Sequence, residues 1–255
     1  MMLVGAALKG YAIEAADGAA GSVSEFLFDD TTWKIRWLVV NTGNWLSGRK
    51  VLLHPSSIGQ PDYDREVLPV SLTKAKIQAS PDIMRDAPVS VQMQSSLYDY
   101  YGWDPLWGGG YLGPISMAHP LAPPPYFGAP AVREALDEGT LVMDGDPHLR
   151  SSKTVTGYHI HAEDGHIGHL ENLLIDDATW TIRYLIVDTS NWWIGKHVLV
   201  SPYAVRRINW SDQTIDININ KARLTSSPPW DPLTTIDLAY EQRLHRHYNW
   251  PGYGW

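Results

Sequence analysis

The chain of 255 residues contains no cysteine. This absence excludes a disulfide scaffold, metal sites with thiolate ligands and catalysis by a cysteine nucleophile. The chain also has no apolar run near the roughly 18 residues that a membrane-spanning helix needs. Its first residues, 1–8, are apolar but lack a basic leading segment, which is atypical of a signal peptide. We therefore expect a cytoplasmic protein without a membrane-spanning segment.

Basic character is missing as well. The formal net charge is −8 at pH 7, and no part of the chain is basic. Proteins that bind nucleic acids or acidic lipids generally present a basic face, because contacts with phosphate supply much of the affinity. We therefore expect no nucleic-acid partner. The three glycines at 108–110 lack the following Lys-Ser/Thr of a phosphate loop, and no cofactor fingerprint is present, so we expect no cofactor.

What the chain does contain is an internal repeat with an offset of 147 positions. The octet DDTTWKIR at 29–36 recurs as DDATWTIR at 176–183, and the match continues without a gap on both sides. A repeat of about 100 residues has the size of a domain rather than of a solenoid unit. We predict a first domain over 1–108, a linker rich in proline and glycine over 109–150, and a second domain over 151–255.

Inside each copy the apolar residues recur with a period of two, which predicts half-buried strands. The runs 35–40 and 182–187 are apolar on both faces, as in a strand that is covered on both sides. Each copy ends in a segment with helical spacing, at Ile236, Tyr240, Leu244 and Tyr248 in the second. The sequence predicts a mainly β fold of two small barrels, each followed by a C-terminal helix.

Laid out in this way, each copy resembles a PRC-barrel domain, the module shared by the H subunit of the photosynthetic reaction centre and a ribosome maturation factor. The resemblance covers roughly 200 residues. It implies a small, strongly bent antiparallel β-barrel that serves in protein–protein interaction and has no catalytic residue set. Two fused copies would then be related by a pseudo-twofold axis. The residues that carry the resemblance in the second copy are Gly157-Tyr158, Asp164-Gly165, Asp176-Asp177, Trp180, Ile182 to Thr189, Trp192 to Gly195 and Pro202.

Seven of the ten histidines lie in the second copy. His159 and His161 flank Ile160, so in a strand they share one face, and imidazoles at this spacing can bind zinc, nickel or copper. The alternative is that both are exposed polar residues opposite the core. The first copy has Ala12 and Glu14 at these positions, so a metal site here would belong to the second copy only.

Arg36 and Arg183 lie in otherwise apolar strands, where a guanidinium group needs an acidic partner or several carbonyl groups. The nearest carboxylates are the aspartate pairs at 29–30 and 176–177. We expect structural ion pairs, and among these aspartates we select Asp30 and Asp177. The aspartate pairs also raise the question of acid–base catalysis, but aspartates in turns more commonly cap their own backbone.

The loops at 44–48 and 191–195 carry large apolar side chains. Trp45 and Leu46 in the first copy correspond to Trp192 and Trp193 in the second. Aromatic loop residues are enriched at interfaces, whereas the competing interpretation is that Trp45 and Trp192 close the end of their own barrel. We take these four residues as candidates for a contact surface.

These observations favour a non-enzymatic interaction or scaffolding protein with an unknown protein partner and with further self-association as an open question. Two alternatives remain. The first is a protein that binds a small ligand or a metal through the His-rich second copy. The second is an accessory subunit of a membrane complex, similar to the use of the module in the photosynthetic reaction centre.

Overall fold

The computed structural model describes residues 1–46, 48–80, 148–189, 197–231 and 236–254. Outside these residues lie 109–147 of the predicted linker, the segment expected to form the first C-terminal helix, and Trp192 and Trp193. Among the described residues, none of the helices has the length and apolar character that crossing a membrane would require.

The fold is mainly β, and the described residues form two sheets of seven and six strands. The strands of the first sheet are, in hydrogen-bonded order, β11 (His197–Val200), β10 (Thr181–Asp188), β9 (Gly165–Asp176), β8 (His159–Ala162), β13 (Thr214–Ile217) and β12 (Val205–Asn209), with β1 (Met2–Val4) paired to β9. Those of the second are β5 (Lys50–Leu53), β4 (Ile35–Asn41), β3 (Gly18–Asp29), β2 (Ala12–Ala15) and β6 (Val67–Pro69), with β7 (Leu149–Ser151) paired to β3.

Short helices follow or connect these strands. The α-helices are α1 (Gly5–Leu8), α2 (Lys74–Gln78), α5 (Ser152–Val155), α6 (Lys221–Thr225) and α7 (Leu238–Tyr248), and the 3-10 turns are η1 (Gly43–Leu46), η2 (Pro55–Ser57) and η4 (Pro202–Ala204). The helix expected from the spacing of the second copy is α7, which buries Leu244 and Tyr248. It begins after Ile236, with Asp237 as its cap, because the Asp237 side chain accepts a hydrogen bond from the Tyr240 amide.

The structure differs from the expected antiparallel barrels in two respects. Strand β2 pairs with β6 in parallel, and β8 pairs with β13 in parallel. The long path from β2 to β6 returns the chain beside β2 in the same direction, as parallel pairing requires. In the described part of the chain neither sheet closes on itself, since their hydrogen-bonded paths end at β11 and β12 and at β5 and β6.

Elements of the first sheet recur in the second at the offset of 147 positions. Strand β3 begins at Gly18 and β9 at Gly165, and both end at the first aspartate of the repeated octet. Backbone conformation recurs as well, because Trp33 and Trp180 have φ values of 58° and 50°. Such left-handed values are uncommon for a bulky residue and mark a tight turn. The repeated octets therefore form equivalent turns.

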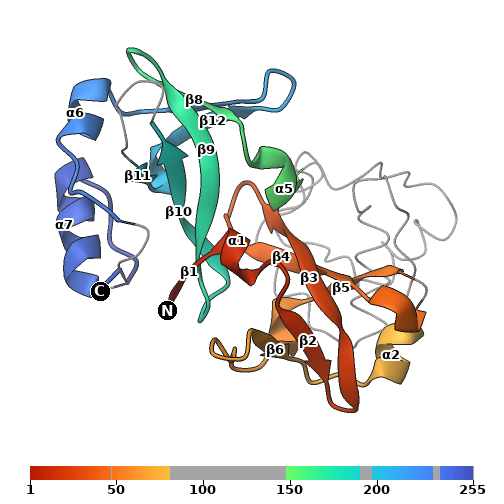
Figure 1. The fold of residues 1–255 in the computed structure, drawn as a ribbon. Coiled ribbons are helices and arrows are strands. Elements are labelled where there is room, and N and C mark those ends of the chain that lie inside the picture. The colour runs from red at the N-terminus through yellow and green to blue at the C-terminus, as the bar shows by residue number, and fades with distance from the viewer. Residues whose placement is uncertain (47, 81–147, 190–196, 232–235, 255) are drawn as a thin grey trace, which may run out of the picture. The chain divides into compact units, whose positions relative to one another are not determined.

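The chain divides into two compact units. Unit 1 comprises Met1–Tyr11, Val23–Val39 and Arg150–Trp255, and unit 2 comprises Ala12–Ser22 and Val40–Leu149. In unit 1, α6 and α7 lie alongside the sheet that contains β9, β10 and β11 (Figure 1). The core of unit 1 includes Trp37, Phe26 and Tyr184, and that of unit 2 includes Ile13, Leu52 and Leu68, all at most 2% exposed.

Within unit 1, residues of the two copies form reciprocal contacts. The Ile35 amide donates a hydrogen bond to the Trp180 carbonyl at 2.8 Å, and the Ile182 amide donates to the Trp33 carbonyl at 2.8 Å. Equivalent positions of the two copies thus donate to and accept from each other across the contact. The terminal strands behave alike, since β1 of the first copy pairs with β9 of the second and β7 pairs with β3.

Candidate functional site

The turn η1 holds two of the predicted contact residues, Trp45 and Leu46, and both are half-buried. The Trp45 indole N–H donates a hydrogen bond to the Ala20 carbonyl at 3.0 Å. The Lys74 ammonium group lies over the indole ring, 4.8 Å from the ring centroid. The turn is therefore held by its own aromatic side chain, while part of Trp45 and of Leu46 remains accessible. The other predicted contact residues, Trp192 and Trp193, lie outside the described residues.

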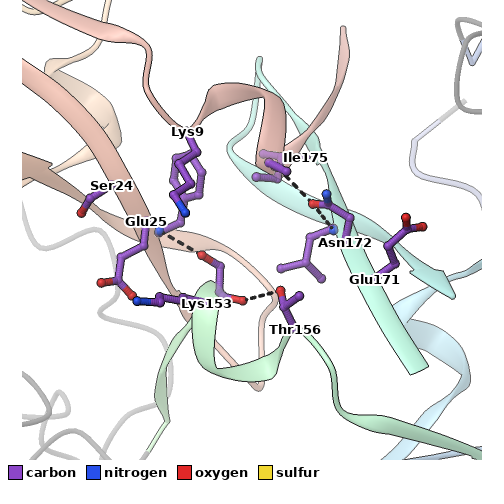
Figure 2. Close-up of a pocket in the computed structure, with 13 residues that line it drawn as sticks. Lys9, Ser24, Glu25, Lys153, Thr156, Glu171, Asn172 and Ile175 are labelled. Carbon is purple, nitrogen blue, oxygen red and sulfur yellow. Dashed lines mark hydrogen bonds between the residues drawn. The ribbon is translucent and has the colours of Figure 1, made fainter. Parts of the chain in front are cut away.

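A pocket of about 210 Å³ lies in unit 1 and was not expected from the sequence (Figure 2). Its lining residues come from α1, β3, α5 and β9, together with Lys9 and Thr156, which directly follow the two helices. All but Ile175 fall into pairs at the repeat offset, namely Gly5 with Ser152, Ala6 with Lys153, Lys9 with Thr156, Ser24 with Glu171, Glu25 with Asn172 and Phe26 with Leu173. The two copies thus contribute equivalent positions to one pocket but different side chains.

The pocket has mixed charge. Lys9 and Glu25 come from the first copy, and Lys153 and Glu171 come from the second. Glu25 accepts a hydrogen bond from the Ser151 hydroxyl, and Glu171 pairs with His197 at 2.9 Å. With lysines and glutamates present in equal number, the lining favours neither an anion nor a cation by net charge.

Two polar side chains shape the pocket wall, as the dashed lines in Figure 2 show. The Ser152 hydroxyl accepts a hydrogen bond from the Phe26 amide at 3.0 Å. Asn172 accepts from the amides of Ala6 at 3.1 Å and Leu173 at 2.9 Å through Oδ1. Each of these bonds satisfies a backbone amide, so these two side chains hold the segments of the pocket together.

The predicted metal candidates lie in the hairpin formed by β8 and β9. His159 is exposed and His161 half-buried, on the strand face opposite the fully buried Ile160. His166, on β9 across from His161, completes a cluster that was not expected from the sequence. Its Nε2 lies 3.3 Å from Nδ1 of His159, and its ring centroid lies 5.7 Å from that of His161. In the described parts of the chain no three His, Asp or Glu side chains are arranged to hold a metal ion.

The predicted ion pairs form one position earlier than expected. Arg36 pairs with Asp29 at 3.5 Å rather than with Asp30, and Arg183 pairs with Asp176 at 2.5 Å rather than with Asp177. Successive side chains of a strand point to opposite faces, so only one aspartate of each pair can face the arginine. The second aspartate binds elsewhere: Asp30 pairs with Arg150 at 2.9 Å, and Asp177 with the N-terminal ammonium group.

The buried aspartates also order the turns. Burial alone would raise the pKa of Asp29, but hydrogen bonds from Thr31 and Thr32 and the charge of Arg36 lower that pKa overall. At Asp176, burial is likewise outweighed by Thr179, Arg183 and Ala178, and the pKa is lowered. Both carboxylates therefore remain ionised and serve as acceptors in the turn, which is the capping role expected of aspartates there.

A buried polar network attaches α7 to the sheet of unit 1. The Tyr184 hydroxyl donates a hydrogen bond to Glu241 at 2.9 Å and lies 2.7 Å from Nε2 of His245. The Nδ1–H group of His245 donates to the Pro251 carbonyl at 2.6 Å. Glu241 also lies 3.5 Å from Arg183.

Spacing along the sequence does not predict this network, because its hydrogen bonds join residues as many as 61 positions apart. The signal available was the pair of polar residues, Glu241 and His245, on the helix face that also carries Leu244 and Tyr248. Burial lowers the pKa of His245, and Arg183 lowers it further against the opposing effect of the Pro251 carbonyl. The network therefore favours a neutral imidazole.

The comparisons with known proteins do not assign this chain to a family. No family model matches the chain, and no curated protein matches it. The similarity to PRC-barrel domains therefore stays a prediction from the residues.

Proposed function

We propose that this chain is an interaction or scaffolding protein built from two PRC-like modules that are related by a pseudo-twofold axis. The repeated element bounds and the reciprocal bonds of Ile35 and Ile182 support this arrangement. A fused pair has the contacts of a dimer without the entropic cost of association. The fusion also allows the two copies to diverge, as the unlike side chains of the shared pocket illustrate.

The observation that carries the proposal is the partial exposure of Trp45 and Leu46 on the turn η1. A half-exposed indole on a turn supplies a large apolar contact area, and tryptophan is enriched among residues that dominate binding energy. The bond to Ala20 and the contact with Lys74 fix the ring before any partner binds. Such preorganisation lowers the entropy lost on binding. The turn therefore has the features of a contact surface for a protein partner.

The experiment is affinity isolation of the tagged full chain from its native host under gentle detergent, followed by mass spectrometry. The variants are Trp45→Ala and Leu46→Ala, with Arg65→Ala as control because its side chain is 65% exposed and lies in the same unit. We expect one stoichiometric partner whose recovery falls at least about tenfold with Trp45→Ala, the loss expected for a dominant contact residue. The control should retain it.

A Trp45→Phe variant separates contact from anchoring. It keeps an aromatic ring but removes the N–H group that binds Ala20. Thermal unfolding of each variant shows whether the fold is kept. The proposal is contradicted if folded Trp45→Ala and Leu46→Ala proteins recover the same partner at wild-type level, or if the wild-type chain recovers no stoichiometric partner.

A further inference from the structure

The hairpin of β8 and β9 gathers imidazoles on one face. In its register, His159 lies opposite His169 and His161 opposite His166, with a bulge between the two pairs. Residues opposite one another on neighbouring strands have side chains on the same side of the sheet. His159 and His161 share that side because they are two positions apart. Backbone pairing thus fixes the position of the Cα and Cβ atoms that carry each of these imidazole rings.

The distance between two of these rings matches the geometry of a metal chelate. Nε2 of His166 and Nδ1 of His159 are 3.3 Å apart. Two nitrogen ligands of a tetrahedral ion, each at about 2.0–2.1 Å from the metal, are separated by about 3.3–3.4 Å. Without a metal, one ring donates its N–H to the other. With a metal, both lone pairs face the ion, and the nitrogens need not move apart.

We propose that His159 and His166 chelate one divalent transition metal ion, of the zinc, copper or nickel class, with solvent in the remaining positions. His161 is the nearest additional imidazole, since its ring centroid lies 5.7 Å from that of His166. The site is a two-ligand site in the described structure, so it binds and releases its ion reversibly. This proposal does not depend on the partner proposed above.

The surroundings set the strength and the selectivity of the site. Imidazole nitrogen suits zinc, copper and nickel, whereas magnesium and calcium prefer oxygen ligands. Asp216, 3.8 Å from His161, adds negative charge at one side, although it also binds Arg207 at 2.8 Å. Lys221 adds positive charge near His166 and opposes a cation.

The first copy supplies a natural comparison, because it has Ala12 and Ala19 where the second has His159 and His166. The proposed site is a feature that the second copy alone has acquired.

The test is a titration of the full, metal-free chain with Zn²⁺ by isothermal calorimetry at pH 7.5. We expect saturable binding of one ion at this site and a loss in affinity of at least about tenfold with His159→Ala and with His166→Ala. His161→Ala should reduce affinity less. His247→Ala is the control, since its ring binds the Arg223 carbonyl on α6 instead. Mg²⁺ should not compete.

Nuclear magnetic resonance locates the ion independently of affinity. Added Cu²⁺ should broaden the amide signals of β8 and of the start of β9 before those of other strands. Far-UV circular dichroism establishes that the alanine variants keep their fold, which is expected because the substituted rings at 159 and 166 are exposed. The proposal fails if the wild-type chain shows no saturable Zn²⁺ binding, or if both alanine variants bind as the wild type does.

Discussion

Gly168 lies so close to Asp188 that a Cβ atom on the glycine would fall 1.9 Å from the Asp188 carbonyl oxygen. The first copy has the same relationship, with 2.2 Å between a Cβ on Gly21 and the Asn41 carbonyl oxygen. Each glycine lies at a register shift, with φ of 148° and 134°. The bulge therefore lets two backbones approach in a way that only glycine permits.

A Gly168→Ala substitution should accordingly destabilise the protein more than Gly157→Ala. Both glycines have positive φ, but a Cβ on Gly157 would meet nothing within 4 Å. Backbone strain alone should cost Gly157→Ala about 1 kcal/mol, whereas strain and overlap together should cost Gly168→Ala about 2–4 kcal/mol. Urea unfolding measures both. Equal losses in the two variants would contradict the close approach of Gly168 to Asp188.

The arginine pairs allow a second prediction, on which aspartate stabilises the turn. A double-mutant cycle of Arg183→Met with Asp176→Asn should give a coupling free energy of at least about 1 kcal/mol, because the pair is mostly buried. The parallel cycle of Arg183→Met with Asp177→Asn should give a coupling near zero. Chemical unfolding of all six proteins supplies the values. A larger coupling with Asp177 would restore the pairing first expected from the sequence.

These pairs also show how far the sequence could lead. The repeat predicted equivalent turns and strands, and the apolar runs at 35–40 and 182–187 are strands with almost every residue buried. An ion pair was predicted in each hairpin, but the arginines pair with Asp29 and Asp176 instead of the predicted Asp30 and Asp177. Choosing between adjacent aspartates requires the exact point where strand becomes turn, and that boundary is the least certain feature of a sequence pattern.

Contacts between distant segments were beyond the sequence for a different reason. Tyr184 is an aromatic residue in a strand and Glu241 is an acidic residue in a helix. Nothing in their spacing along the sequence indicates that their side chains are in contact. Their contact depends on where α7 packs, which many side chains decide together. The contact between His166 and His159 is easier to predict from the sequence. Once the turn at 163–164 is recognised, hairpin pairing aligns the two segments that carry these residues.

Removal of the Tyr184 hydroxyl should loosen α7. A Tyr184→Phe substitution leaves Glu241 and His245 buried, at 7% and 3% exposure, without one of their hydrogen-bond partners. Loss of such a partner costs about 1–3 kcal/mol. Hydrogen exchange should then accelerate in α7 more than in β4 of the other sheet. Tyr203→Phe is the matched control, because that tyrosine is 45% exposed. Unchanged exchange in α7 would show that the network does not hold the helix.

Stability should fall as the pH is lowered, in two separate ranges. Burial and then Arg183 leave the pKa of His245 below its ordinary value of 6.5. In the window between the folded and unfolded values, unfolding takes up a proton, so acid favours the unfolded state as the pH falls through 6.5. The pKa values of Asp29 and Asp176 are lowered as well, from 3.8. Their contribution is present above pH 3.8 and is lost as the pH falls through the folded values.

Variants assign each range to its residues. Asp176→Asn should flatten the decline of the unfolding free energy below about pH 4, since the amide does not titrate there. His245→Gln should flatten the decline that begins as the pH falls through 6.5 and leave the lower range unchanged. Asp64→Asn is the control, because that side chain is exposed. Urea unfolding at intervals of half a pH unit supplies the curves. A wild-type unfolding free energy that rises as the pH falls through 6.5 would overturn the assignment to His245, because it would require a histidine that binds its proton more tightly in the folded state.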